Sequence, residues 1–167
     1  MRPLATLIAA FLSCLAVAAE AGKPLEVLLI AGGCCHDYAT QTQILKKGIE
    51  ARVRSHVTVA YSPDTSTKAT FDIYGKPDWD KGYDVVIHDE CSCDVTDRAY
   101  IERILAAHRR GKPAVNIHCA MHSYRRGDFR QPVELGADNA DWFEMVGLQD
   151  RKSTRLNSSH LVISYAV

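Results

Sequence analysis

The stretch "LEVLLIAGGCCHDY", residues 25–38, sets the fold that we expect for this chain. It begins as a continuous apolar run that ends in glycine, a pattern typical of a buried strand in a parallel sheet. Ala31–Tyr38 then brings together two glycines, two cysteines, a histidine, an aspartate and a tyrosine. Open parallel sheets bind ligands outside the carboxyl ends of their strands, so reactive side chains are expected at this point.

Two further segments extend this strand into an alternation of helix and strand. Residues 40–53 place apolar side chains near helical spacing, with Thr40 as a plausible cap, and predict a helix. Residues 56–62 alternate and are rich in β-branched side chains, which predicts a second strand. Residues 63–82 are rich in turn formers and have no clear assignment, although residues 70–74 alternate as a short extra strand would.

The second half of the pattern repeats the first. Residues 83–90 and 113–120 predict a third and a fourth strand. Between them, residues 95–112 predict an amphipathic helix with Asp97 near its start and Gly111 after its last turn. This alternation is typical of an α/β fold. We therefore expect a flavodoxin-like parallel sheet with helices on both faces, in which the first strand lies next to the third and the fourth lies beyond it.

The N-terminus of the 167-residue chain departs from this pattern. Residues 1–21 combine Arg2, an apolar run and small residues spaced for signal peptidase, so we interpret them as a secretory signal cleaved after Ala19 or Ala21. The run falls short of the ~20 apolar residues of a membrane anchor. A lipid anchor at Cys14 is disfavoured because the residues after it are apolar. We therefore expect a secreted or periplasmic protein with no stable membrane anchor after signal cleavage.

The C-terminal residues 150–167 also depart from the pattern. They lack apolar periodicity before His160 and follow a helical segment without a linker. Written back as codons, they resemble a common sequencing-library adapter, so we interpret them as a non-native tail; a genuine basic tail is the alternative. The domain then spans residues 25–149 and is truncated before the later strands of its sheet. Such a tail is expected to make few contacts with residues 25–148.

The charge of the chain bears on its partners. After cleavage at Ala19 and without residues 150–167, sixteen basic and nineteen acidic side chains remain. A slightly acidic domain offers no basic surface for nucleic acid or for an anionic membrane. The ligand that we expect is a small molecule, and the composition makes no prediction of the oligomeric state.

Cysteines and histidines gather at the predicted carboxyl ends of three strands. All five cysteines that follow the signal lie there: Cys34, Cys35, Cys91, Cys93 and Cys119. Four histidines fall in the same segments: His36, His88, His118 and His122. The flavodoxin-like strand order brings these segments to one edge of the sheet, so their convergence is the strongest functional signal in the sequence.

Two pairs of residues suggest a chemistry for this edge. His36 and Asp37 are candidates for an acid/base pair, because imidazole titrates near neutral pH and a carboxylate orients it. Asp37 is equally suited to cap the following helix, and the two roles are compatible. His118 and His122 have the four-residue spacing that zinc sites use on a helix. This interval crosses a strand end, so the spacing alone does not place both imidazoles on one helical face. The alternative is that the histidines form hydrogen bonds with a sugar-like ligand.

The cysteines have two interpretations. In an oxidising compartment, a disulfide from Cys34 or Cys35 to Cys91 or Cys93 would link neighbouring strands. Ligation of a soft metal would require the same thiols in the reduced form. We favour disulfides or buried free thiols. His88 is expected in the core, and internal packing is favoured over sugar stacking for four aromatic residues: Trp79, Trp142, Tyr38 and Tyr124.

Four segments in order resemble the ThuA-like, or trehalose utilisation, family. They are "VLLIAGGCCHDY", "GYDVVIHDE", "RILAAHRRGKPAVNIHCAMHSYR" and "DWFEMVGL". The resemblance covers about Leu25 to Leu148 and rests on the ordered set. It implies the fold of class I glutamine amidotransferases and a role in carbohydrate catabolism, often in exported bacterial proteins. An enzyme and a non-catalytic sugar-binding module both agree with it.

The resemblance also sets expectations for single residues. Where a glutaminase carries its nucleophilic cysteine, this sequence has His118, and Cys119 follows one position later. Since successive side chains of a strand face opposite ways, we expect Cys119 to point away from the site and not to act as a nucleophile. The expected site is a polar cleft for a carbohydrate, lined by His36, Asp37, Glu90, His118 and His122. Any metal there is expected to be zinc or a similar divalent ion on His36, His118 and His122.

Overall fold

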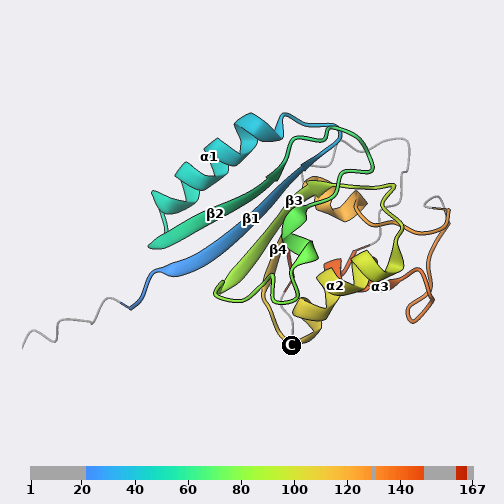
Figure 1. The fold of residues 1–167 in the computed structure, drawn as a ribbon. Helices are drawn as coiled ribbons and strands as arrows, with labels where there is room; N and C mark the ends of the chain where they lie inside the picture. The colour runs from blue at the N-terminus through green and yellow to red at the C-terminus, as the bar shows by residue number, and fades with distance from the viewer. Residues whose placement is uncertain (1–21, 129–130, 149–160, 165–167) are drawn as a thin grey trace, which may run out of the picture.

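The computed structural model describes residues 22–128, 131–148 and 161–164 (Figure 1). The proposed signal at residues 1–21 lies outside the described residues, as do residues 150–160 and 165–167 of the proposed tail. The elements follow in the order β1 (Leu25–Gly33), α1 (Tyr38–Glu50), β2 (Ser55–Ser62), η1 (Asp72–Gly75), β3 (Val85–Cys91), α2 (Arg98–Arg109), β4 (Ala114–Ile117), η2 (His118–His122), α3 (Asp141–Val146) and β5 (Leu161–Ser164).

The strands form one sheet in the order β2-β1-β3-β4-β5. β1, β2, β3 and β4 run parallel to one another, and β5 pairs antiparallel with β4. The first strand therefore lies next to the third and the fourth lies beyond it, which confirms the predicted α/β, flavodoxin-like arrangement.

Helices cover both faces of this sheet, α1 on one and α2 with α3 on the other (Figure 1). Val27 and Leu29 of β1 pack on the side of Ile49 from α1, whereas Leu28 and Ile30 belong to the core that contains α2. Burial on both faces explains why this strand is a continuous apolar run and does not alternate. None of the helices in the described part of the chain is long and apolar enough to cross a membrane.

Short polar side chains fix where the two long helices begin. Asp37 caps α1, because its Oδ1 accepts a hydrogen bond from the backbone N–H of Thr40 at 3.1 Å. The cap is thus Asp37 and not Thr40. Asp97 caps α2 as predicted, and Gly111 follows its end with a φ of 95°.

The segment at residues 70–74 differs from the suggested extra strand. It contains the 3-10 turn η1, and both Tyr74 within this turn and Phe71 directly before it are buried. Residues three apart lie on the same side of a 3-10 turn, so this conformation buries both aromatic rings, which a strand would place on opposite faces.

Four residues of the proposed tail pair with the sheet. The backbone of Leu161–Ser164 runs antiparallel to β4 along the whole of that strand. The expectation of few contacts with residues 25–148 is therefore not met at these residues. A sheet edge offers unpaired N–H and C=O groups to any segment with strand propensity, and "LVIS" is such a segment.

β1 and β3 lie in close contact where both strands end. Gly33 pairs with Cys91 across the two strands and has a φ of 94°. A Cβ atom added at Gly33 would lie 2.2 Å from the carbonyl oxygen of Cys91. Only glycine therefore fits between the two strands here, and the position of the following loop depends on it.

We expect Gly33→Ala to destabilise the fold more than Gly82→Ala does. Gly82 has a similar φ of 88° but open space around it, so the control carries the backbone strain without the overlap. The difference between the two variants should be about 1–3 kcal/mol, the usual cost of overpacking. Urea unfolding of both variants measures it, and equal midpoints would contradict the role given to Gly33.

Candidate functional site

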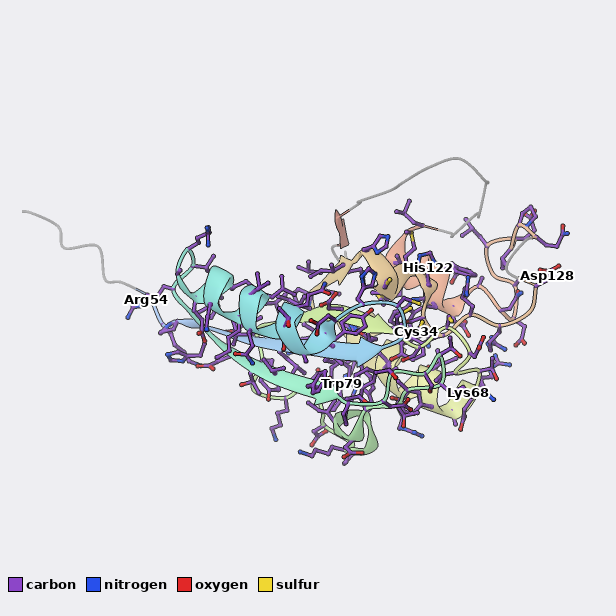
Figure 2. All side chains as sticks on the ribbon, turned by 90° about the horizontal axis from the view of Figure 1, so that it is seen from above. Cys34, Arg54, Lys68, Trp79, His122 and Asp128 are labelled. Carbon is purple, nitrogen blue, oxygen red and sulfur yellow. The ribbon has the colours of Figure 1, made fainter. Side chains whose placement is uncertain are left out.

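Three loops meet at the carboxyl ends of β1, β3 and β4. Cys34, Cys91 and Cys119 form one buried cluster there, and Cys93 packs against it. Figure 2 shows Cys34 and His122 toward the same end of the sheet, far from Arg54 at the other end. The predicted convergence of the cysteine and histidine segments is confirmed.

His36 and Cys119 connect the loop after β1 with the turn after β4. His36 Nε2, from the loop after β1, lies 3.0 Å from the Sγ atom of Cys119 in η2. His118 Nδ1 lies 3.4 Å from the same sulfur, and the His36 and His118 rings are 5.5 Å apart. The His122 ring stands 5.8 Å from that of His118. Three of the predicted site residues therefore lie together.

Cys119 faces these histidines, so the expectation that it points away from the site was wrong. β4 ends at Ile117, and the chain turns into η2 at His118, which has a φ of 22°. Alternation of side chains applies only within a strand, and the turn rotates the next side chain back toward His36. Because η2 is a 3-10 helix, His118 and His122, which are four residues apart, are not aligned as they would be on an α-helix.

The surroundings of Cys119 favour its thiolate. A hydrogen bond from Cys91 lowers the pKa of Cys119 to about 5, with further contributions from His36, His118 and His122 and with burial opposing them. The pKa of Cys91 moves the other way, because its proton is held in the hydrogen bond to Cys119 and the thiol is buried. Cys119 is thus the sulfur of this pair that ionises first.

All five cysteines of the described chain are free thiols in this structure. The alternative of buried free thiols describes Cys34, Cys91 and Cys119, whereas Cys35 is exposed and Cys93 is partly buried. Two groups of side chains have donor atoms within 4.8 Å of one another: Cys34, Cys35 and Cys91 form one, and His36, His118 and Cys119 form the other. The second group shares two members with the predicted zinc ligands and replaces His122 by Cys119. Nitrogen and sulfur donors of this kind suit zinc.

Glu90 lies apart from the histidines that were expected beside it. Its Oε1 accepts hydrogen bonds from the hydroxyls of Tyr74 and Tyr124 and lies 2.8 Å from His88 Nδ1, all within the core on the α2 side. His88 is fully buried, in line with the expected core position. Glu90 is thus part of an internal polar network and does not line the edge.

The neighbouring Asp89 faces the other side of β3 and was missed by the sequence reasoning. Its Oδ1 accepts a hydrogen bond from Gln41 Nε2 of α1 at 3.1 Å. Burial raises the pKa of Asp89 to about 8, with Glu90 and Cys119 adding to the rise. Successive side chains of a strand face opposite sides of the sheet. Because β3 is buried on both sides, the sequence does not show whether Asp89 or Glu90 faces α1.

A cavity of about 290 Å³ opens beside the start of α1. His36 and Asp37 line it together with Tyr61, Ser62 and Asp64. Tyr61 is 44% exposed, whereas the four aromatic residues considered for sugar stacking are buried: Trp79, Trp142, Tyr38 and Tyr124. Of these four, Tyr38 also lines the cavity. The exposed aromatic side chain at this edge is thus one that the sequence reasoning did not single out, although its place at the end of a strand was a signal.

No protein-family model, curated protein or solved structure matches this chain.

A second buried histidine anchors α2 to β3. His108 Nδ1 donates to the carbonyl of Lys112 at 2.9 Å, so His108 Nε2 accepts the proton of His88 Nε2, also at 2.9 Å. Burial lowers the pKa of His108 to about 4, and His88 adds to the decrease. His108 is thus a buried residue that serves the core.

The lowered pKa of His108 predicts a loss of stability in acid. Unfolding returns the imidazole to an ordinary pKa near 6.5. Its contribution is therefore present above pH 6.5 and lost as the pH falls through about 4, by at most ~1.4 kcal/mol per pH unit.

Replacement of His108 by glutamine should remove this slope. We expect the free energy of unfolding of His108→Gln, followed in urea from pH 4 to 7, to fall less steeply toward acid than that of the parent protein. His56→Gln, at an exposed histidine of β2, is the control and should leave the slope as it is. Parallel curves for His108→Gln and the parent would refute the assignment.

Proposed function

We propose that this chain is an exported ThuA-like protein that acts in carbohydrate catabolism, on trehalose or a keto-glycoside. The alternative is a non-catalytic sugar-binding module that uses the same residues. The proposed compartment is the periplasm or the exterior, and the proposed partner is a small carbohydrate. The flavodoxin-like strand order supports an amidotransferase-like fold, and the cavity at the carboxyl edge carries the functional part of the proposal.

The size and lining of this cavity suit one sugar ring. Its volume of about 290 Å³ is just below the roughly 300–1,000 Å³ typical of small-molecule sites. A sugar ring offers hydroxyl groups at its rim and C–H groups on its faces. The ring of Tyr61 supplies an apolar surface, and Ser62 supplies a hydroxyl group.

Two carboxylates add acceptors for sugar hydroxyl groups. Asp37 and Asp64 both line the cavity, and each uses Oδ1 for a backbone N–H, that of Thr40 and that of Ser66. The second oxygen of each carboxylate then serves a ligand. These hydrogen bonds lower the pKa of both carboxylic acids, so both groups are ionised acceptors at neutral pH.

His36 connects the cavity with the other histidines. It lines the cavity and also contacts Cys119, which lies between His36 and His118. Imidazoles at this position donate or accept a proton at a sugar hydroxyl group or at the carbonyl of a keto-sugar. Cys119 and His118 hold the His36 ring in place, and His122 extends the set of donors along η2.

Binding and turnover of candidate sugars test this proposal. We expect the purified full chain to act on trehalose, on a glucoside or on their 3-keto forms, and we expect His36→Ala and His118→Ala to lose turnover by at least ~100-fold, the lower scale of acid/base catalysis. His56→Ala, far from the edge, is the control. If calorimetry detects sugar binding that depends on His36 but no turnover is found, the chain is the sugar-binding module and not an enzyme. If none of these sugars binds, the carbohydrate proposal is refuted.

Replacement of Cys119 separates positioning from covalent chemistry. Serine keeps a hydrogen-bonding group beside His36 but does not form an anion at neutral pH. We expect Cys119→Ser to keep turnover within a few fold, whereas His118→Ala abolishes it. The opposite ranking, measured under the same conditions, would show that the thiolate attacks the substrate.

A further inference from the structure

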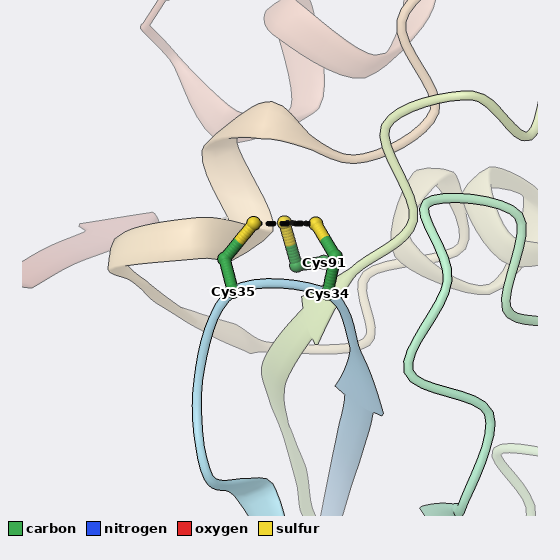
Figure 3. Close-up of side chains that lie close together, drawn as sticks. All are labelled: Cys34, Cys35 and Cys91. Atoms are coloured by element: carbon green, nitrogen blue, oxygen red, sulfur yellow. Dashed lines mark hydrogen bonds between the residues drawn. The ribbon is translucent and has the colours of Figure 1, made fainter.

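Three thiols from two strands meet at one point of the edge. Cys34 Sγ lies 3.3 Å from Cys91 Sγ and 2.6 Å from Cys35 Sγ, and Figure 3 shows the three sulfur atoms close together above the loop after β1. All three lie within 4.8 Å of one another. None of the three lines the cavity beside α1. The cluster is therefore separate from the proposed sugar site.

The backbone builds this cluster on both sides. The N–H of Cys34 donates to the carbonyl of Cys91 at 3.1 Å, directly after the close approach at Gly33. Cys35 has a φ of 83°, which is uncommon for a residue other than glycine and turns its side chain back over Cys34. A strained backbone that directs a thiol toward two others is typical of a functional position.

The burial of the thiols suits an ion that enters from solvent. Cys34 and Cys91 are buried, and Cys35 is exposed. The sulfur atoms of Cys34 and Cys91 therefore lie on the inner side of the cluster, and that of Cys35 lies on the side that faces the solvent. An incoming ion thus meets Cys35 first and displaces S–H protons, which pass to the solvent.

The donor set selects a soft, monovalent ion. Three thiolates without oxygen or nitrogen ligands favour Cu(I), whereas structural zinc sites complete a tetrahedron with a fourth ligand. Three sulfur atoms bound at about 2.3 Å around one ion stand about 4.0 Å apart. This separation is larger than the present sulfur–sulfur distances of 3.3 Å and 2.6 Å and smaller than the 4.8 Å within which all three sulfur atoms lie. Rotation of the exposed Cys35 side chain lengthens its distances to the other two sulfur atoms, and the Cys34 and Cys91 sulfur atoms have to separate from their present 3.3 Å as the ion binds.

We propose that Cys34, Cys35 and Cys91 bind one Cu(I) ion. Binding forms three Cu–S bonds and breaks up to three S–H bonds. Copper remains in the +1 state and no thiol is oxidised, so no electron acceptor is required. The site shares no ligand with the cavity, although Cys91 also forms a hydrogen bond with Cys119 beside His36.

Competition with a chromophoric Cu(I) chelator tests the site. The reduced full chain, kept without oxygen, should take up one Cu(I) per chain and show sulfur-to-copper absorption in the near ultraviolet. Cys35→Ser should weaken the affinity at least ~10-fold, the lower scale for the loss of a supporting group at a metal site. Cys35 is exposed, so this variant is expected to fold even if Cys91→Ser does not.

Cys93→Ser is the matched control, because Cys93 packs against the same cluster but is not one of its three converging thiols. It should bind Cu(I) as the parent does. Equal affinities of Cys35→Ser and Cys93→Ser would overturn the proposal. The proposal would also be overturned if His118→Ala fails to bind copper while Cys35→Ser still binds it. That result would place the ion on His36, His118 and Cys119.

Two further outcomes count against copper at this site. Tighter binding of Zn²⁺ than of Cu(I) in parallel titrations would overturn the choice of ion. A Cys34–Cys91 disulfide in protein purified without reductant, with no copper uptake after reduction, would show that the thiols serve a cross-link.

Discussion

The contact between Gly33 and the backbone of Cys91 determines the geometry of the whole carboxyl edge. Glycine lets β1 leave the sheet against β3 with no side chain between them, and the hydrogen bond from Cys34 to Cys91 follows from that approach. The loop after β1 then carries Cys34, Cys35 and His36 over the end of β3. A larger residue would lift this loop, and both the thiol cluster and the contact of His36 with Cys119 would be lost.

β3 separates two polar systems by the alternation of its side chains. His88 and Glu90 face the α2 side and join the buried tyrosines and His108. Asp89 and Cys91 face the α1 side and belong to the edge with Gln41 and Cys119. Adjacent residues of this strand thus belong to two polar systems on opposite faces of the sheet. The two systems still interact, because Glu90 adds to the raised pKa of Asp89.

The sequence predicted the architecture because the relevant signals are local. Continuous apolar strands, capped helices and their alternation lead to a doubly covered parallel sheet, and the sheet brings its strand ends together. The site was harder to predict, because the facing of Glu90 and Cys119 depends on tertiary structure. In a strand that is buried on both faces, the residue types do not show which face a side chain occupies. The strand alternation predicted that Cys119 points away from the site, but the turn at His118 directs it toward His36. The exposed Tyr61 was missed for a related reason, since its exposure depends on what covers the end of β2.

The strand order also has a consequence for how the chain folds. β1, α1 and β2 are consecutive and form contacts that are local in sequence, whereas Cys34 and Cys91 are 57 positions apart. Closing so long a loop costs entropy before any contact offsets it, so β3 is expected to dock after the first β-α-β unit. During that interval Cys34 and Cys35 are exposed to solvent side by side, without their third partner. The redox state of the compartment in which the chain folds therefore acts on this pair before the sheet is complete.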